Sequence, residues 1–298
     1  MDEKRPICDY EGSDYQERFW ESGERLYEDH VEAVALKKLL PPEGNRILEV
    51  GAGAGRNTPR YRNFQQVILV DYARSQLELA QERLGGGDRY IYVVADAYQL
   101  PFAEGVFDCV TMIRTLHHMV DPEMVLRQVS SVSRSGAIFI LEFANKRNLK
   151  AILRWLARRQ VWNPFHRGSI EFAKLNFNFH PRDIRDWLGQ AQFKVDRQLT
   201  VSHFRVPGLK RWVPLKLLVK LDSALQWTGK LWQYTPSVFI RSVAVGDRAR
   251  FQEDAFWRCP SCGALGLTEG EVGLICQGCA RIWTFRDGIY DFREPLEV

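Results

Sequence analysis

Short apolar runs alternate with stretches of helical spacing along most of the chain. Apolar runs bounded by turn residues predict seven buried strands, at residues 46–50, 66–70, 89–95, 107–113, 137–143, 193–201 and 237–245. Apolar positions three and four apart predict helices at residues 15–26, 31–40, 75–84, 122–132 and 181–188. Because strands alternate with helices, the pattern indicates an α/β fold with a seven-stranded, mostly parallel, doubly wound sheet.

The chain has 298 residues, more than the roughly 100 to 200 of a typical domain. The pattern divides it into an N-terminal helical segment (1–44), a main domain (45–247) and a small C-terminal unit (248–298). Two insertions interrupt the main domain, at about 145–178 and about 202–236. Connections of this kind leave from the carboxyl ends of strands, so we expect both insertions to overhang that edge as a helical lid.

The composition is that of a globular protein, with 45% hydrophobic and 26% charged residues. It excludes collagen-like, coiled-coil and wholly disordered chains. The opening residues are acidic and lack the apolar stretch of a secretory signal, and no run of 18 apolar residues occurs. These features predict a cytoplasmic protein, and a peripheral contact with a membrane stays open.

The charge is distributed unevenly along the chain. Residues 1–144 carry 16 basic and 23 acidic side chains, a net charge of −7, whereas residues 145–220 carry 17 and 4, a net charge of +13. A basic segment of this size favours an anionic partner, either nucleic acid, a membrane surface or an acidic substrate. The alternative is a basic face that is simply solvated.

A glycine-rich bend follows the first predicted strand, in the sequence Gly51-Ala52-Gly53-Ala54-Gly55. Glycines let the backbone approach a ligand closely and turn into the helix that we expect next. The dinucleotide fingerprint would need a further glycine at the position of Arg56, which disfavours nicotinamide and flavin cofactors. Asp71 ends the second strand, where a carboxylate can accept the hydroxyls of a ribose, and Asp96 follows the third, within reach of an adenine amino group.

The stretches ILEVGAGAGR, VILVDYARSQLELAQERL, VVADAYQLPFAEGVFDCVTMIRTLHHMVDP and SVSRSGAIFILEF lie between residues 45 and 143. Together they resemble the class I S-adenosylmethionine-dependent methyltransferases, especially the group that includes the ubiquinone/menaquinone C-methyltransferases. The resemblance implies that the last two strands form an antiparallel pair at one edge of the sheet. It also implies the following cofactor contacts: Glu49, Gly51, Gly53 and Gly55 with the methionine part, Asp71 with the ribose, and Tyr72, Asp96 and Ala97 with the adenine.

Methyl transfer from a sulfonium demands little of the protein beyond in-line positioning in a site that excludes water. His117 and His118 follow the fourth strand and are the candidate catalytic residues; alternatively they only pack against the turn before Asp121. The Asn/Asp-Pro-Pro-aromatic motif, which is common in enzymes that methylate exocyclic amines of nucleic-acid bases, is missing after the fourth strand. Cys109 lies within the strand, so we expect it to be a small core residue rather than a nucleophile.

The first insertion contains a basic amphipathic helix. Leu149, Ile152, Leu153 and Leu156 follow helical spacing, while basic residues occupy another face. Such a helix can cover its own domain as a lid, or contact anionic lipid headgroups or RNA phosphates.

Two Cys-x-x-Cys pairs punctuate the C-terminal unit, Cys259 with Cys262 and Cys276 with Cys279. Four thiolates at this spacing predict a tetrahedral structural zinc site, which leaves no open position for catalysis. The unit resembles the small zinc-ribbon activator subunits of tRNA, rRNA and protein methyltransferases.

The sequence thus predicts an S-adenosylmethionine-dependent methyltransferase with a structural zinc, acting on a small or lipid-like metabolite. An RNA methyltransferase that binds its substrate through the basic insertion and the ribbon is the alternative enzyme. A non-catalytic regulatory or scaffold protein is the alternative of another class.

Overall fold

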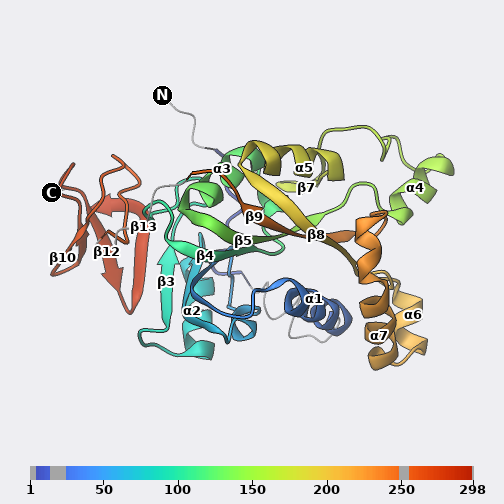
Figure 1. Cartoon of the computed structure of the whole chain (residues 1–298), viewed down its shortest axis with the longest axis horizontal. Coiled ribbons are helices and arrows are strands. Elements are labelled where there is room, and N and C mark those ends of the chain that lie inside the picture. Colours follow the sequence, from blue (N-terminus) through green and yellow to red (C-terminus); the bar gives the residue numbers. More distant parts are fainter. Residues whose placement is uncertain (1–4, 14–24, 248–254, 297–298) are drawn as a thin grey trace.

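An eleven-stranded sheet forms the centre of the computed structural model, which describes residues 5–13, 25–247 and 255–296 (Figure 1). Its strands are β1 (Gly44–Val50), β2 (Phe64–Asp71), β3 (Tyr90–Val94), β4 (Phe107–Met112), β5 (Ser133–Ala144), β8 (Phe193–Val201), β9 (Ser237–Ala244), β10 (Thr268–Gly270), β11 (Gly273–Ile275), β12 (Ile282–Arg286) and β13 (Ile289–Leu296). Their order across the sheet is β10-β11-β12-β13-β3-β2-β1-β4-β5-β9-β8. All seven strands predicted for the main domain are present.

The strand directions agree with the predicted fold. β3, β2, β1, β4 and β5 run parallel, and β9 is antiparallel to both of its neighbours, β5 and β8. The last two strands of the main domain therefore form the expected antiparallel pair at one edge. Cys109 is fully buried within β4, where burial raises the pKa of its thiol, in line with the expected core role.

Helices cover both faces of the sheet. They are α1 (Leu26–Leu39), α2 (Arg74–Leu84), α3 (Pro122–Val132), α4 (Leu149–Leu156), α5 (Pro181–Gln190), α6 (Pro207–Trp212) and α7 (Leu215–Leu225), with the 3₁₀ helices η2 (Thr58–Arg60), η3 (Leu116–His118) and η4 (Gln226–Lys230). Alternate residues of a strand point to opposite faces. In β1, Leu48 and Val50 pack with α3 and α5, whereas Ile47 packs with α1, α2 and α7. The sheet is thus doubly wound, as predicted.

Helix starts follow local capping chemistry. The Asp121 carboxylate accepts a hydrogen bond from the Met124 N–H (3.0 Å) at the start of α3, and Pro122 occupies the first turn. No side chain of its own segment caps α2. Instead, the Glu11 carboxylate accepts hydrogen bonds from the N–H groups of Arg74 (2.7 Å) and Ser75 (3.1 Å), which ties residues 5–13 to this helix.

The helix expected directly after the glycine bend is not formed; that prediction was wrong. The backbone has positive φ at Gly51, Gly53 and Gly55, so the chain is still turning there. The eight residues left before β2 hold only the short helix η2. The other early prediction, a helical piece at residues 15–26, lies almost wholly outside the described residues.

The C-terminal unit is joined to the main sheet, which the sequence pattern did not indicate. β13 pairs in parallel with β3, in the register Ile289 with Tyr92 and Asp291 with Val94, and β10, β11 and β12 extend the sheet beyond it. β13 thereby covers what would otherwise be an exposed edge strand.

Each of the two insertions has its own secondary structure. The first contains α4 and a hairpin of β6 (Ile170–Ala173) and β7 (Asn176–Asn178). The second contains α6, α7 and η4, and α7 packs against α1. Within the described ranges, no helix has both the length and the apolar character needed to cross a bilayer.

Candidate functional site

A pocket opens where β1, β2 and β3 end, the edge at which parallel sheets bind ligands. It holds about 830 Å³ of empty space, its open mouth included. Six of the eight predicted cofactor residues line it: Gly51, Gly53, Asp71, Tyr72, Asp96 and Ala97. The structure therefore brings together residues from three successive strand ends, as the sequence analysis expected.

The glycine bend leaves room for a ligand at one position in particular. A Cβ atom added at Gly51 would come within 2.2 Å of the Thr115 hydroxyl, so this glycine is required by close packing. A Cβ added at Gly53 would meet nothing within 4 Å, and the residue lines the pocket with φ of +52°. Gly53 thus presents bare backbone to the cavity, which a ligand can approach closely.

Backbone donors hold the two acidic residues in place. The Asp71 carboxylate accepts hydrogen bonds from the Gly53 N–H (2.8 Å) and the Ala73 N–H (3.0 Å). Asp96 accepts one from the Tyr98 N–H (2.9 Å). Burial raises the pKa of both carboxyls, and these donors oppose the rise. Both acids are therefore pre-oriented in the wall of the pocket.

Glu49 and Gly55 do not line the pocket, and their contact with a ligand stays a prediction. The Glu49 carboxylate accepts hydrogen bonds from the hydroxyls of Thr58 (2.6 Å) and Tyr61 (3.1 Å), and burial raises its pKa to about 7. Gly55 packs against α2, where an added Cβ would lie 2.9 Å from Leu84. Both residues pack on the side of the glycine bend that faces away from the pocket.

Of the two histidines, His118 lines the pocket and His117 does not. The His118 Nδ1 atom lies 3.1 Å from the carbonyl oxygen of Leu175, which can only accept, so Nδ1 carries the proton. The Nε2 atom then accepts from the Tyr10 hydroxyl at 3.2 Å. Burial lowers the pKa of both imidazoles, which favours their neutral forms.

The N-terminal segment supplies a wall that the sequence analysis did not identify. Pro6, Ile7, Cys8 and Tyr10 line the pocket, held there by the contact of Glu11 with α2. No periodicity marks these residues, because the stretch is too short to show one. Neither insertion contributes a lining residue in the described part of the chain, so their role as a lid stays a prediction, supported only by the contact of Leu175 with His118.

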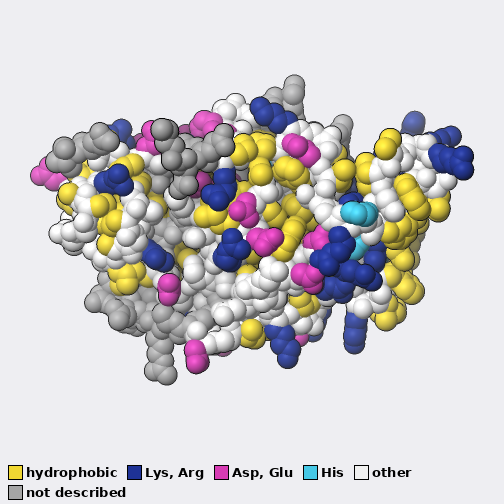
Figure 2. All heavy atoms as spheres, turned by 90° about the horizontal axis from the view of Figure 1, so that it is seen from above, with side chains coloured by type: hydrophobic (Ala, Val, Ile, Leu, Met, Phe, Trp, Pro, Cys, Tyr) yellow, Lys and Arg dark blue, Asp and Glu magenta, His cyan; other side chains and the backbone are white. Residues whose placement is uncertain are grey.

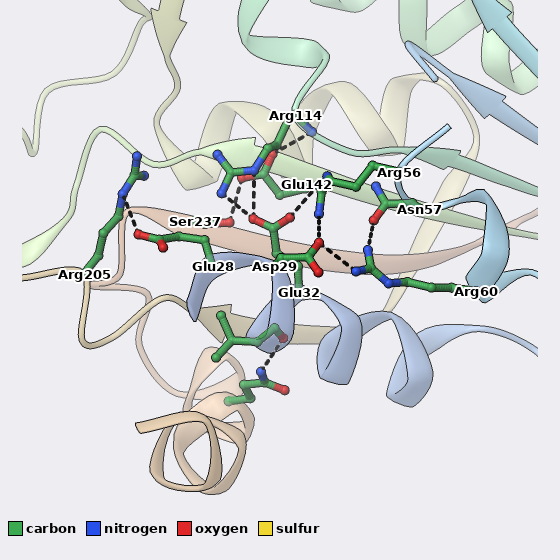
Figure 3. A network of polar contacts seen from close by, with 12 residues as sticks. Glu28, Asp29, Glu32, Arg56, Asn57, Arg60, Arg114, Glu142, Arg205 and Ser237 are labelled. Atoms are coloured by element: carbon green, nitrogen blue, oxygen red, sulfur yellow. Dashed lines mark hydrogen bonds and ion pairs between the residues drawn. The ribbon is translucent and has the colours of Figure 1, made fainter. Parts of the chain in front are cut away.

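A buried network of charges stands behind one wall of the pocket (Figure 3). Arg114, which lines the pocket, donates from Nε to Glu32 of α1 (2.8 Å), and its backbone N–H donates to Glu142 of β5 (3.0 Å). Glu32 also accepts from Arg56 of the glycine bend (2.8 Å). Burial alone would raise the pKa of Glu32, but Arg114 and Arg56 outweigh it and hold the pKa low. The network fixes α1 against the loops that build the site.

The four cysteines of the C-terminal unit converge. Their Sγ atoms lie within 4.8 Å of one another, with 3.8 Å between Cys259 and Cys279 and 3.5 Å between Cys262 and Cys276. A zinc ion with Zn–S bonds of about 2.3 Å requires sulfur atoms about 3.8 Å apart at the corners of a tetrahedron. The donor set therefore fits zinc in number, type and spacing.

Arg293 of β13 links the C-terminal unit to the pocket. Its guanidinium lies 5.6 Å from the centre of the Tyr72 ring, a pocket residue, and it forms an ion pair with Asp291 (2.7 Å). A second ion pair, at 3.9 Å, joins it to Glu11. Arg293 thus contacts both the residue that follows β2 and the N-terminal segment.

Comparison with known proteins agrees with this geometry. A family profile described as a methyltransferase domain matches residues 48–141. The demethylmenaquinone methyltransferase of Clavibacter sepedonicus is 34% identical over 119 residues, 39% of this chain and 49% of that protein. The ubiquinone/menaquinone biosynthesis C-methyltransferase UbiE of Pseudomonas savastanoi pv. phaseolicola is 34% identical over 113 residues, 35% of this chain and 44% of that protein. The chain spans about half the length of these curated relatives.

Solved structures share the fold at low sequence identity. A chain of the complex between the Haloferax volcanii Trm112 methyltransferase activator and a methyltransferase is 15% identical, with a TM-score of 0.55 over 79% of this chain and 96% of that chain. A SAM-dependent methyltransferase of Thermotoga maritima is 21% identical, with a TM-score of 0.51 over 77% of this chain and 98% of that chain. Residues 48–141 thus match a methyltransferase-domain profile, and the chain shares the fold of these solved structures.

Proposed function

We propose that the chain is an S-adenosylmethionine-dependent methyltransferase acting on a small or lipid-like metabolite. The observation that carries this proposal is the meeting of Gly53, Asp71 and Asp96 in one pocket at three successive strand ends. Bare backbone beside two oriented carboxylates suits a nucleoside with an amino-acid chain.

The chain's own residues would hold the ligand as follows. Gly53 leaves space for the methionine part, the Asp71 carboxylate accepts the ribose hydroxyls, and Asp96 with Ala97 contacts the adenine. Tyr72 packs beside the base, supported from behind by Arg293. S-adenosylmethionine supplies an electrophilic methyl group, so the protein's main task is to align the acceptor with it and to exclude water.

His118 is the proposed proton acceptor where the methylated group must lose a proton. Its Nδ1–H is held by the Leu175 carbonyl, which leaves Nε2 free of a proton and hydrogen-bonded to the Tyr10 hydroxyl. A proton leaving the acceptor can reach Nε2 directly or through that hydroxyl. His117, which does not line the pocket, is proposed to orient its neighbour by packing, with ring centres 4.0 Å apart.

The acceptor class is inferred from the pocket and from the relatives. One relative is named a demethylmenaquinone methyltransferase and the other is named for ubiquinone/menaquinone biosynthesis, which supports a lipid-like substrate. The wall also includes apolar residues such as Ile7 and Met119. RNA methylation is the second candidate, favoured by the net charge of +13 over residues 145–220. The well-formed pocket argues against a purely regulatory role.

We further propose that residues 255–296 form a zinc ribbon that stabilises the catalytic domain within the same chain. The converging cysteines support the zinc, and the pairing of β13 with β3 supports the stabilising role. Four thiolates complete the coordination of zinc, so the metal would be structural. Together with the N-terminal helix, the proposed organisation is that of one methyltransferase domain with two appendages.

Calorimetry of S-adenosylmethionine binding tests the proposed function. Replacing Asp71 by Ala removes charge-assisted hydrogen bonds and should weaken binding at least about tenfold. The matched control is Asp88→Ala, an exposed acid in the loop before β3, which should bind like the parent. Absence of binding by the parent, or equal binding by Asp71→Ala, would refute the proposal.

A further inference from the structure

One end of the molecule carries a large apolar surface. It is built from α4, α7, η4 and the residues that follow η4, and every side chain in it is at least 39% exposed. We call this set the apolar end: Leu149, Leu153, Leu156, Leu217, Leu221, Leu225, Trp227, Leu231, Trp232 and Tyr234. Contiguous apolar surface of this kind marks an interaction site.

The apolar end is continuous although its parts come from both insertions. The Leu149 N–H at the start of α4 donates to the Tyr234 carbonyl (2.7 Å), and the Arg147 guanidinium lies 5.5 Å from the centre of the Tyr234 ring. α7 leads directly into η4. Figure 1 places α4, α6 and α7 at the same end, and Figure 2 shows hydrophobic and basic side chains side by side there.

The helix α7 has a broad apolar surface, and only part of it is used inside the protein. Leu218 is buried on the side facing α1, together with Asp222. Leu217, Leu221 and Leu225 recur at every fourth position along the adjoining side and are exposed. α4 is similar, since only Ala151 of its eight residues is buried. Both helices therefore present apolar rows that no described part of the chain covers.

Basic side chains surround these rows. Eight are exposed, and no described acidic side chain pairs with them: Lys150, Arg154, Arg158, Arg159, Arg211, Lys216, Lys220 and Lys230. Residues 149–159 and 207–234 contain a single acidic residue, Asp222. That carboxylate is buried and accepts hydrogen bonds from Tyr27 (2.6 Å) and the His203 backbone (2.8 Å), so it does not offset the surface charge.

We propose that the apolar end docks in the interface of a membrane that contains anionic lipids. Exposed leucines and tryptophans enter the boundary between headgroups and acyl chains, while the eight basic side chains meet lipid phosphates. A second copy of the chain would bring the same eight positive charges together. Nucleic acid would satisfy the charges but leave the leucine rows in water. The docking does not depend on methyl transfer.

Vesicle sedimentation of the full chain tests the proposal. We expect binding to vesicles of phosphatidylcholine and phosphatidylglycerol (3:1), and at least tenfold weaker binding to phosphatidylcholine alone. The double variant Leu153→Gln/Leu221→Gln should lose at least about tenfold in partitioning to the anionic vesicles. The double variant Lys150→Gln/Lys220→Gln should lose a similar amount.

The matched control is Leu265→Gln/Val272→Gln, two exposed apolar residues of the C-terminal unit, which should partition like the parent. All these positions are exposed, and circular dichroism with S-adenosylmethionine calorimetry checks that each variant folds. The proposal is overturned if the parent does not bind anionic vesicles, or if the leucine variant binds them like the parent. Preferential binding of a short RNA, or dimerisation in sedimentation velocity that the leucine variant abolishes, would likewise replace the membrane with another partner.

Discussion

At the scale of single residues, Glu49 shows how the fold holds a buried acid at the end of a strand. The sequence places it directly before the glycine bend, and resemblance assigns it a ligand contact. In the structure its two oxygens accept from Thr58 and Tyr61, and it is 3% exposed. Burial raises its pKa from 4.5 to about 7, because the charged form loses its hydration.

The raised pKa makes the contribution of Glu49 to stability depend on pH. That contribution is complete below the unfolded value of 4.5 and is lost as pH rises through about 7. Glu49→Gln carries no titrating group at this position and so shows no such loss. The free energy of unfolding of the parent minus that of the variant should therefore fall by about 2 to 3 kcal/mol between pH 5 and pH 8. Urea unfolding at several pH values measures it. The exposed control Glu43→Gln should give a constant difference, and a constant difference for Glu49→Gln would contradict the prediction.

At the scale of elements, the addition of β13 to β3 makes the C-terminal unit part of the main sheet. The backbone of β3 pairs on one side with β2 and on the other with β13, and Ile289 is buried in the same cluster as Tyr92. The loops that hold the four cysteines lie in this unit. A metal that orders these loops should therefore stabilise an edge of the main domain.

Metal removal tests this coupling. We expect about one zinc per chain in reduced protein, and faster amide hydrogen exchange in β10 to β13 and in β3 after chelation. The variant Cys262→Ser should behave in the same way. β8, at the opposite edge of the sheet, provides the internal control and should keep its protection. Unchanged exchange in β3 after the metal has left would show that the two parts are independent.

At the scale of the whole molecule, buried charges join α1 to loops that are far away in the sequence. Glu32 is fully buried and accepts hydrogen bonds from both Arg56, after β1, and Arg114, after β4. Glu28 pairs with Lys210 of α6 (2.5 Å) and with Arg205 (3.5 Å). One face of α1 thereby fixes the position of the pocket wall and of the second insertion.

Replacing Glu32 by Gln would remove the buried carboxylate that Arg56 and Arg114 share, while Asp29 still pairs with Arg56. We expect a loss of about 3 to 5 kcal/mol in the free energy of unfolding, measured in urea. Glu82→Gln, on the exposed face of α2, is the matched control and should change stability by less than about 0.5 kcal/mol. A similarly small change in the free energy of unfolding for Glu32→Gln would contradict the prediction and mean that water solvates the arginines of the network.

The sequence alone determined features that rest on local patterns. Apolar runs located the seven strands of the main domain, because burial on both faces demands continuous apolar residues. The glycine bend, Asp71 and Asp96 could be assigned to one site, because the carboxyl ends of parallel strands share an edge. The Cys-x-x-Cys spacing located the thiolate cluster, because each pair forms its own turn.

Only the tertiary structure decided which distant segments meet. Tyr10 reaches His118 across 108 positions, and Arg293 reaches Tyr72 across 221. β13 pairs with β3 rather than folding apart, and Glu49 turns to Thr58 and Tyr61 instead of the pocket. Such contacts depend on how elements pack, and periodicity reports only whether a residue is buried. It does not identify the partner against which the residue is buried, because many partners offer the same apolar area or the same charge.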